Sequence, residues 1–459
     1  MLGKQQLLSG LKEWSFTQIE QTILKDKNFN EADLLAIVND YDSLKTIHQQ
    51  AISLLYRYFN PKREWKTSQT PLLEMYYAVS KAGHVLGLSG LIQFQVGTTQ
   101  YRFDPEGEYS SVSLQYITEH LALYNQKHPS GVCEAITEAY QFSLSLSHAS
   151  TNHYHEIAGK FFANHYQAGK LVYLSSGWYK HGIGIALYGD YLIYCNRGQA
   201  GDQRFGCKVF RIKDKSKINQ EFFNKIGTWH FKSATELHNL LSTVIDFDSP
   251  TLKFRCKGQR HGTCAYVNAK SIVEALIVMI QAGPYSSKAE LDEAYNTEYK
   301  RKKYKCFTSF VRDLEIDELI VSMFYAQNIE LLHFYAHLAK EIIRQHHGKG
   351  RGYIKDNEEI KRAYNFYHRI PDKVKRLMDN DHSFAQIMRE LKVQYEKISC
   401  TSTDNLSKWP HVEYVRGYET HHRYKVNIDN GHIVSINDNP TPKMRFSFRQ
   451  ARELISVFG

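Results

Sequence analysis

The sequence predicts an α+β protein with more than one domain. At 459 residues the chain exceeds the length at which single hydrophobic cores stop growing. Stretches with helical periodicity alternate with short β-rich runs that are bounded by turn residues. Apolar residues make up 42% and charged residues 23% of the chain, which is the ordinary balance of a globular protein with buried cores.

Residues 1–125 are predicted to be a mainly helical N-terminal region. Amphipathic helices are expected near Phe16–Leu24, Leu44–Phe59 and Leu72–Val85, where apolar residues recur at helical spacing. A hairpin-like segment, Leu91–Phe103, interrupts them because its apolar and polar residues alternate.

Residues 126–310 are predicted to form a mixed core of helices and strands. The long helix of this core is expected to begin at Cys264. The other expected helices are Cys133–Leu146, Ile157–Tyr166, Asn219–Ile226 and Ala234–Val244, and the expected strands are Leu171–Ser175, Gly182–Tyr188, Tyr191–Asn196, Gly206–Ile212 and Thr251–Cys256.

Residues 311–400 are predicted to be helical, and residues 401–459 to be a small α/β region. A long apolar-faced segment is expected to begin at Leu314 and to run on to about Ile343. In the last region an Asn-Gly pair is typical of a tight hairpin turn. The strands that this turn joins are expected at Tyr424–Ile428 and His432–Ile436.

The net charge of the chain indicates which kinds of partner it can bind. With 58 Lys+Arg against 48 Asp+Glu the formal net charge is +10, which favours encounter with acidic surfaces. The basic runs Lys300–Lys303 and Lys349–Gly352 are candidate contacts for an anionic surface. No helix carries a basic stripe and no zinc-finger spacing occurs, so nucleic acid is not an expected partner.

Cysteine usage and hydropathy predict a soluble protein in a reducing cytosol. The 7 cysteines contain no CxxC pair and are expected to be free thiols. The N-terminal residues lack the uninterrupted apolar core of a signal peptide. The longest apolar run, Ile272–Ile280, contains Glu274 and is too short to span a bilayer.

A candidate catalytic base lies in the predicted hairpin. A two-residue Gly-Asp turn makes Tyr188 face Tyr191, and the same register places Ile183 opposite Asn196. His181 and Ile183 share a face because side chains alternate along a strand, so Asn196 lies diagonally beside His181. A histidine held by an amide has a fixed tautomer and orientation, as a general base requires.

Cys264 is the candidate nucleophile. Thr263 is expected to cap the helix that Cys264 opens, where free N–H groups and the helix dipole lower the pKa of a thiol. Gln259, on the preceding loop, can direct an amide N–H at an oxyanion alongside the backbone N–H of Cys264. Gly262 allows the chain to approach a substrate closely.

The order His181, Asn196, Gln259 and Cys264 resembles the CE-clan and papain-like cysteine proteases of the bacterial effector type. The resemblance covers about 170–310, and includes Trp178 before the histidine and the later segment 304–308. It implies a cysteine-protease-like core, in which a small mixed or antiparallel sheet packs on the nucleophile helix. Helical regions and a small C-terminal β-containing cap would flank this core. Asn196 stands where CE-clan enzymes usually have Asp, and Gly182 where they have an aromatic residue.

The resemblance also implies roles for the four residues. Cys264 would be the nucleophile, His181 the base, Asn196 its orienting partner and Gln259 the oxyanion donor. The implied activity is hydrolysis of a peptide or isopeptide bond in a host protein, such as a ubiquitin-like protein or its conjugates. The implied protein is a secreted virulence effector that is delivered into the host cell cytoplasm and needs no cofactor or metal.

Several alternatives remain open at this stage. Cys133 also follows a helix start, and Cys133, His181 and Asn196 occur in the papain-like order; Gln259 and Gly262 favour Cys264. Acyl transfer or deamidation would use the same residues as hydrolysis, and a catalytically inactive adaptor would use none of them. The remaining candidates are expected to be non-catalytic: Cys195, Cys207 and Cys306 as core residues, and His148, His153, His155, His421 and His422 as histidines without metal-ligand spacing.

Overall fold

The computed structural model describes residues 71–103, 110–149, 154–178, 181–198, 200–202, 204–227, 231–255, 264–347, 357–401, 414–416, 423–427 and 432–435. The helices expected at Phe16–Leu24 and Leu44–Phe59 lie outside these residues. The described residues divide into two compact units, of which the first spans 110–311 and the second comprises 71–103 and everything from Arg312 onward. The segment 110–125 therefore belongs with the core, and 71–103 groups with the C-terminal residues.

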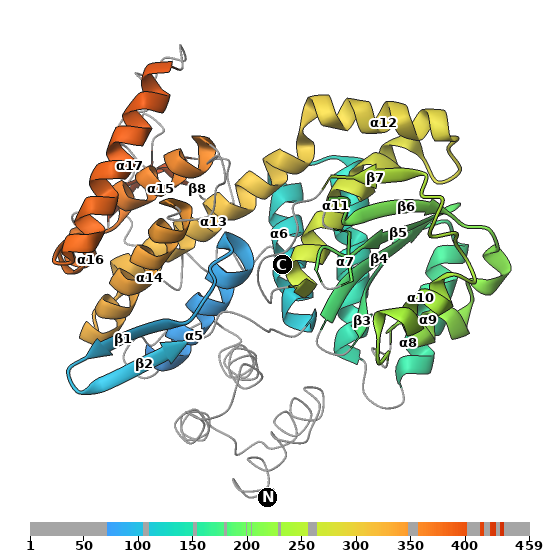
Figure 1. Ribbon diagram of the computed structural model, residues 1–459, viewed down its shortest axis with the longest axis horizontal. Coiled ribbons are helices and arrows are strands. Elements are labelled where there is room, and N and C mark those ends of the chain that lie inside the picture. Colours follow the sequence, from blue (N-terminus) through green and yellow to red (C-terminus); the bar gives the residue numbers. More distant parts are fainter. Residues whose placement is uncertain are drawn as a thin grey trace, which may run out of the picture. The chain divides into compact units, whose positions relative to one another are not determined.

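A five-stranded sheet organises the first unit (Figure 1). All neighbouring strands are antiparallel and follow one another in chain order, β3-β4-β5-β6-β7. The predicted pairing of Tyr188 with Tyr191 is confirmed, as is an α+β fold with small antiparallel sheets. The strands are β3 (Val172–Trp178), β4 (His181–Tyr188), β5 (Tyr191–Cys195), β6 (Cys207–Arg211) and β7 (Leu252–Phe254).

Helices cover both faces of this sheet, which explains why β5 is buried along its whole length. Helices α8, α9 and α10 lie on one face, and α7 and α11 pack on the other, with α6 against α7 and α11. The helix expected to begin at Cys264 is confirmed as α11. The bounds are α6 (Ser110–Lys127), α7 (Gly131–Ala149), α8 (Tyr154–Gln167), α9 (Gln220–Gly227), α10 (Ala234–Leu241), α11 (Cys264–Ala282) and α12 (Lys288–Arg301).

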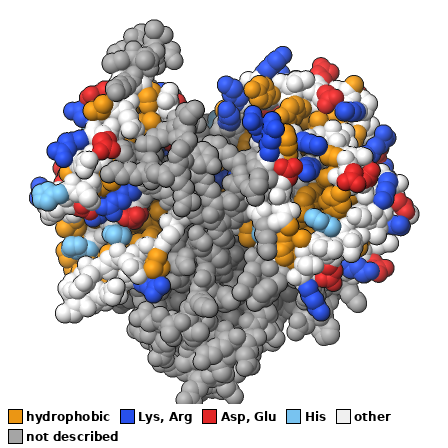
Figure 2. All heavy atoms as spheres, in the orientation of Figure 1, with side chains coloured by type: hydrophobic (Ala, Val, Ile, Leu, Met, Phe, Trp, Pro, Cys, Tyr) orange, Lys and Arg blue, Asp and Glu red, His pale blue; other side chains and the backbone are white. Residues whose placement is uncertain are grey.

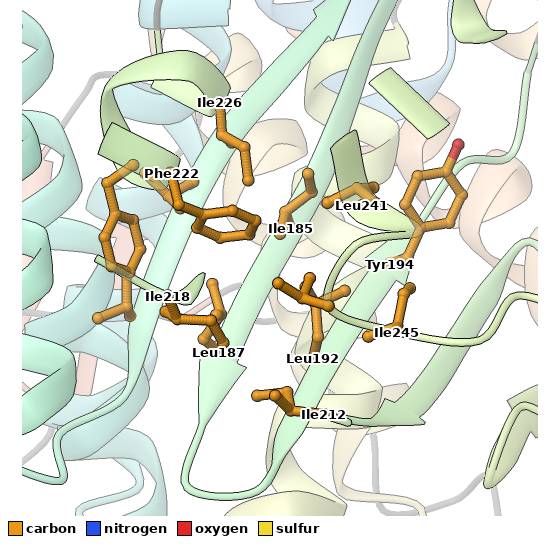
Figure 3. Packing of buried hydrophobic residues seen from close by; sticks show 14 of the residues in the cluster. Ile185, Leu187, Leu192, Tyr194, Ile212, Ile218, Phe222, Ile226, Leu241 and Ile245 are labelled. Atoms are coloured by element: carbon orange, nitrogen blue, oxygen red, sulfur yellow. The ribbon is translucent and has the colours of Figure 1, made fainter. Parts of the chain in front are cut away.

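The hydrophobic core on the α8–α10 face is built from alternate residues of neighbouring strands. Figure 3 shows Ile185, Leu187 and Leu192 of the sheet among Phe222 of α9 and Leu241 of α10. Because strand side chains alternate, the residue of β4 that continues this row at its start is His181. The strand pattern thus places an imidazole at the rim of an otherwise apolar layer.

The opposite face of β4 carries glycines where α11 approaches it most closely. A Cβ atom at Gly182 would lie 3.0 Å from the Cα of Ala265, and one at Gly184 would lie 3.3 Å from the carbonyl oxygen of Asn268. Among the described helices, α11 alone is long and apolar enough by composition to cross a membrane. Since 67% of it is buried within the protein, it has the properties of a core helix.

The second unit contains helices and two small antiparallel sheets. The predicted hairpins are confirmed as β1 with β2 and as β9 with β10. The bounds are α5 (Pro71–Lys81), a π-helical turn η1 (Ala82–Leu86), β1 (Ile92–Val96), β2 (Thr99–Phe103), α13 (Lys303–Tyr325, which starts in the first unit), α14 (Ile329–His347), α15 (Asn357–Arg369), α16 (Asp372–Asp379), α17 (His382–Thr401), β8 (Tyr414–Arg416), β9 (Arg423–Asn427) and β10 (His432–Ser435).

The apolar-faced segment expected from Leu314 to about Ile343 is helical, and it is divided between two helices. The chain forms two helices, α13 and α14, because Asn328 caps the second one: its Oδ1 accepts the N–H of Glu330 at 2.7 Å. An apolar periodicity that continues through a short connection cannot by itself reveal the break.

We expect Gly182→Ala to destabilise the chain more than Gly184→Ala. At Gly182 the added methyl meets the backbone of α11 at Ala265, whereas at Gly184 the contact with a carbonyl oxygen is looser. Overpacking of this kind costs about 1–3 kcal/mol in the free energy of unfolding. Urea denaturation of the two variants and the wild type measures the difference, and an equal or reversed order would contradict close packing at Gly182.

Candidate active site

The first element of the site is the pair His181 and Asn196. The imidazole Nε2 lies 2.9 Å from Oδ1 of Asn196, so the contact expected from the strand register is present. Both side chains are buried, with 6% and 1% of their surfaces exposed. Trp178 is the cross-strand neighbour of His181. The centroids of its ring and of the imidazole are 4.6 Å apart, so the indole limits the movement of the imidazole.

The surroundings of Asn196 fix the tautomer of His181. The backbone N–H of Gly198 donates to Oδ1 of Asn196 at 3.1 Å, which identifies that atom as the amide oxygen. An oxygen that only accepts requires Nε2 of His181 to carry the hydrogen. The lone pair is then on Nδ1, which is the atom able to take a proton from a nucleophile.

A second histidine extends this network. Nδ2 of Asn196 donates to the hydroxyl of Tyr194 at 3.3 Å, and that hydroxyl lies 2.9 Å from Nε2 of His238 on α10. Burial lowers the pKa of His238, so its Nε2 is an acceptor for the Tyr194 O–H at neutral pH. Sequence reasoning did not identify Tyr194 or His238, because their common role arises only when β5 and α10 pack together.

The sulfur of Cys264 lies at the start of β4. Its Sγ accepts the backbone N–H of Gly182 at 3.2 Å. Since that nitrogen is bonded to the carbonyl carbon of His181, the sulfur is within about 6 Å of the Cα of His181. Between these two described side chains there is no hydrogen bond, because His181 points to the α8–α10 face and α11 packs on the other. The described contact of the thiol is therefore with the strand backbone next to His181, and the imidazole lies on the other face of the strand.

Asn268 joins the segments that carry the three residues. It lies one turn after Cys264 in α11 and is fully buried. Its Nδ2 donates to the carbonyl of Gly182 at 2.7 Å, and its Oδ1 accepts the N–H of Arg197 at 2.9 Å. It therefore holds the neighbours of both His181 and Asn196. The sequence analysis missed it, although a polar residue at i+4 from a helix-start cysteine, on a mostly apolar helix, is a usable signal.

The protonation of the site differs from the sequence-based expectation. Burial raises the pKa of the Cys264 thiol above its ordinary value of 9.0, although hydrogen bonds from the N–H groups of Gly182, Ala265 and Cys264 itself act to lower it. The lowered thiol pKa predicted from the helix start is therefore wrong, because desolvation outweighs the helix N-terminus. Burial also lowers the pKa of His181 below 6.5, against the opposing effect of the bond to Asn196. At neutral pH both groups are uncharged.

A pocket opens beside Asn196 on the α8–α10 face. It encloses about 370 Å³ including its open mouth, and neither His181 nor Cys264 lines it. Its walls include Tyr194, Asn196, Phe205, Phe247 and His238, which are mostly aromatic. The residue that orients the histidine thus also contributes to the wall of this pocket.

The other predicted site residues lie apart from this cluster or outside the described residues. Gln259, Gly262 and Thr263 lie outside them. Cys133 is the third residue of α7, where its N–H is bonded to Ser130, and none of its described contacts reaches His181. The cysteines that the sequence assigns to the core are buried at 195 and 207, but Cys306 is exposed and that expectation is wrong.

The described residues contain no group of three His, Cys, Asp or Glu side chains that could hold a metal ion. The side chains of His148, His153, His155, His421 and His422 lie outside the described set.

We expect alkylation of Cys264 by iodoacetamide to rise with pH up to and beyond pH 9. A thiol whose pKa is raised by burial supplies little thiolate at neutral pH. Rates at Cys264, resolved by mass spectrometry between pH 6 and 10, measure this, with exposed Cys306 as an internal comparison. A rate plateau already reached below pH 7 would indicate a thiolate–imidazolium pair and contradict the expectation.

We expect Asn268→Leu to lower the free energy of unfolding by on the order of 3 kcal/mol, since it leaves a buried N–H and a buried C=O without their partner. Denaturant titration measures the loss. Ser271→Ala, one turn further along α11, removes only the bond from Arg197 Nη1 and serves as the control. Equal effects of the two substitutions would show that Asn268 does not hold the strands as described.

Comparison with solved structures gives a relative with a similar fold. No curated protein matches the chain. A solved structure described as the Legionella effector AnkH matches with a TM-score of 0.51 and 14% sequence identity, covering 87% of this chain and 91% of that chain. At this identity the likeness concerns the fold.

A family model described as "Dot/Icm T4SS effector AnkD/LegA15" matches residues 79–359, which is more than half of the chain. This match overturns the assignment to the CE-clan or papain-like cysteine protease family that the order of His181, Asn196, Gln259 and Cys264 suggested. Four residue types in a given order are too few to identify a family, whereas the family model extends through both compact units. The chain belongs to the Dot/Icm T4SS effector AnkD/LegA15 family.

Proposed function

We propose that this effector is a thiol-dependent hydrolase that cleaves a peptide or isopeptide bond in a host protein. Cys264 is the nucleophile and His181 its general base. The observation that carries the proposal is the bond from the N–H of Gly182 to the sulfur of Cys264. This bond holds the sulfur at the residue that follows His181 in the chain, and the buried imidazole of His181 is itself bonded to Asn196.

The cellular setting supports this chemistry. A Dot/Icm effector is delivered into the host cell cytoplasm, where its targets are host proteins. That compartment keeps thiols reduced, and Cys264 is a free cysteine. A protein substrate is therefore available to this thiol.

The proposed reaction uses general-base rather than ion-pair catalysis, because both groups are neutral at rest. Nδ1 of His181 takes the thiol proton while the sulfur forms a bond to the carbonyl carbon. The imidazolium then gives this proton to the leaving amine as the carbon–nitrogen bond breaks, which leaves a thioester on Cys264. Water, deprotonated by the same nitrogen, attacks the thioester and releases a carboxylic acid and the thiol.

Each neighbouring group has a defined role in this scheme. Asn196 keeps Nε2–H fixed and stabilises the imidazolium, and Tyr194 holds the amide in that orientation. The N–H groups at the start of α11 stabilise negative charge on sulfur. Gln259 is proposed as a donor to the oxyanion.

Two related activities use the same thioester. Transfer to an amine gives an acyltransferase, and attack on a side-chain amide gives a deamidase. A different class, a binding adaptor with an inactive site, is favoured by the raised pKa of the thiol and by the lack of a hydrogen bond between the described side chains of Cys264 and His181. Hydrogen bonds of catalytic groups often tighten only when substrate binds, so the hydrolase remains the proposal.

We expect the full chain to be acylated at Cys264 by an activated ester such as p-nitrophenyl acetate. Cys264→Ala should abolish acylation at this position, and His181→Ala should slow it by about 100-fold or more, as loss of a general base does. Nitrophenolate release and mass mapping of the acylated cysteine measure both effects. Cys306→Ala, which removes an exposed thiol, is the matched control and should leave acylation of Cys264 unchanged.

An adaptor gives a different result in the same experiment. Cys264 would then be acylated no faster in the wild type than in His181→Ala, and that equality would refute the hydrolase proposal.

A further inference from the structure

A cluster of basic residues marks the turn between α12 and α13. It consists of Lys300, Arg301, Lys302, Lys303 and Lys305, and is called the basic corner below. Four of the five are exposed and Lys303 is half-buried. Figure 2 shows Lys and Arg side chains gathered over this turn, near the upper end of the view. None of the five forms an ion pair with another described residue.

Helix electrostatics explains only part of this cluster. Lys300 and Arg301 lie in the last turn of α12, where cations interact favourably with the helix dipole. Lys303 and Lys305 lie in the first turn of α13, where cations are unfavourable and where no acidic residue occurs. The fold therefore tolerates like charges at a place where helix stability disfavours them.

The turn residue itself adds a conformational cost. Lys302 has φ 54° and ψ 33°, in the left-handed region that favours glycine or asparagine. A lysine here strains the backbone and adds a charge to four others. Neither property stabilises the turn, which indicates a role outside the fold.

Few negative charges offset the corner. Glu298 is buried beneath it, and its Oε1 accepts the N–H of Tyr304 at the start of α13 at 2.8 Å. Burial raises the pKa of nearby Glu274 to about 7, so this carboxyl is only partly ionised at neutral pH. At least three of the five positive charges therefore remain uncompensated on this exposed turn.

An aromatic side chain accompanies the charges. Tyr299, directly before the basic corner, is 76% exposed, which makes it the most exposed large hydrophobic residue among those described. A tyrosine with an exposed ring and hydroxyl is suited to the level of lipid headgroups. Clustered lysines and arginines next to such a residue are the chemistry that anionic phospholipids attract.

We propose that the basic corner docks the effector on the anionic phospholipid surface of a host membrane. The effector is delivered into the host cytoplasm, and the cytoplasmic leaflet carries phosphatidylserine and phosphoinositides. The five cations lie within six consecutive residues, whereas nucleic acid is usually bound by a longer basic stripe or groove. The proposal does not depend on the activity of Cys264.

Vesicle co-sedimentation with the full chain tests the docking. We expect binding to phosphatidylcholine vesicles that contain phosphatidylserine and none to phosphatidylcholine alone. Each cation contributes a factor of about five to membrane partitioning, so the triple variant K300Q/R301Q/K302Q should bind on the order of a hundredfold more weakly. Binding by the wild type should also fall as salt is raised, because exposed charges are screened.

The matched control removes the same charge elsewhere on the first unit. Three exposed lysines from separate elements or loops serve for this control: Lys160, Lys232 and Lys253. Changing all three to Gln should leave binding to the phosphatidylserine vesicles nearly intact. Equal thermal melting of the two triple variants would show that both fold. If both triple variants lost vesicle binding equally, the basic corner would not be the docking site. If the wild type bound single-stranded RNA more tightly than vesicles, and the corner variant lost that RNA binding, the membrane would be refuted as the partner.

Discussion

The side chain of Asn268 joins three parts of the chain that the backbone alone would leave independent. It comes from α11, donates to β4 at Gly182 and accepts from the segment after β5 at Arg197. A buried amide is stable only when its donors and acceptor are paired, so this residue defines the relative position of helix and strands. The glycines on β4 are needed for the same reason, because they allow the helix backbone close enough for these bonds. The positions of His181, Asn196 and Cys264 follow from this single contact set.

Two opposing physical effects act on the thiol at the helix start. Free N–H groups at the start of a helix stabilise a thiolate, and this effect was the basis of the sequence-based expectation. The packing that brings the sulfur to Gly182 also removes it from water, and desolvation stabilises the neutral thiol. The second effect is larger here. Burial lowers the pKa of His181 because desolvation disfavours the charged imidazolium, and the neutral ring that results is the form able to accept a proton.

Local signals in the sequence predicted the elements that depend on neighbouring residues. The Gly-Asp turn determined the register of β4 and β5, and hence the contact of His181 with Asn196. What depended on packing between distant segments could not be predicted in this way. Tyr194 and His238 meet only because α10 covers β5, and the burial that raises the pKa of Cys264 comes from docking against β4. Asn328 caps the start of α14, and the continuous apolar pattern of this region does not reveal where one helix ends and the next begins. The family could not be predicted from His181, Asn196, Gln259 and Cys264, because the family model matches a much longer segment, residues 79–359.

The strand order of the main sheet has a kinetic consequence. Because β3 to β6 pair in chain order, the sheet can assemble from contacts between segments that are close in sequence, which form rapidly. The sulfur of Cys264 must instead reach Gly182 across a separation of 82 residues. Closing so long a loop is slow relative to forming a hairpin, so we expect α11 to dock late. A folding chain would then hold a formed sheet before Cys264 reaches Gly182.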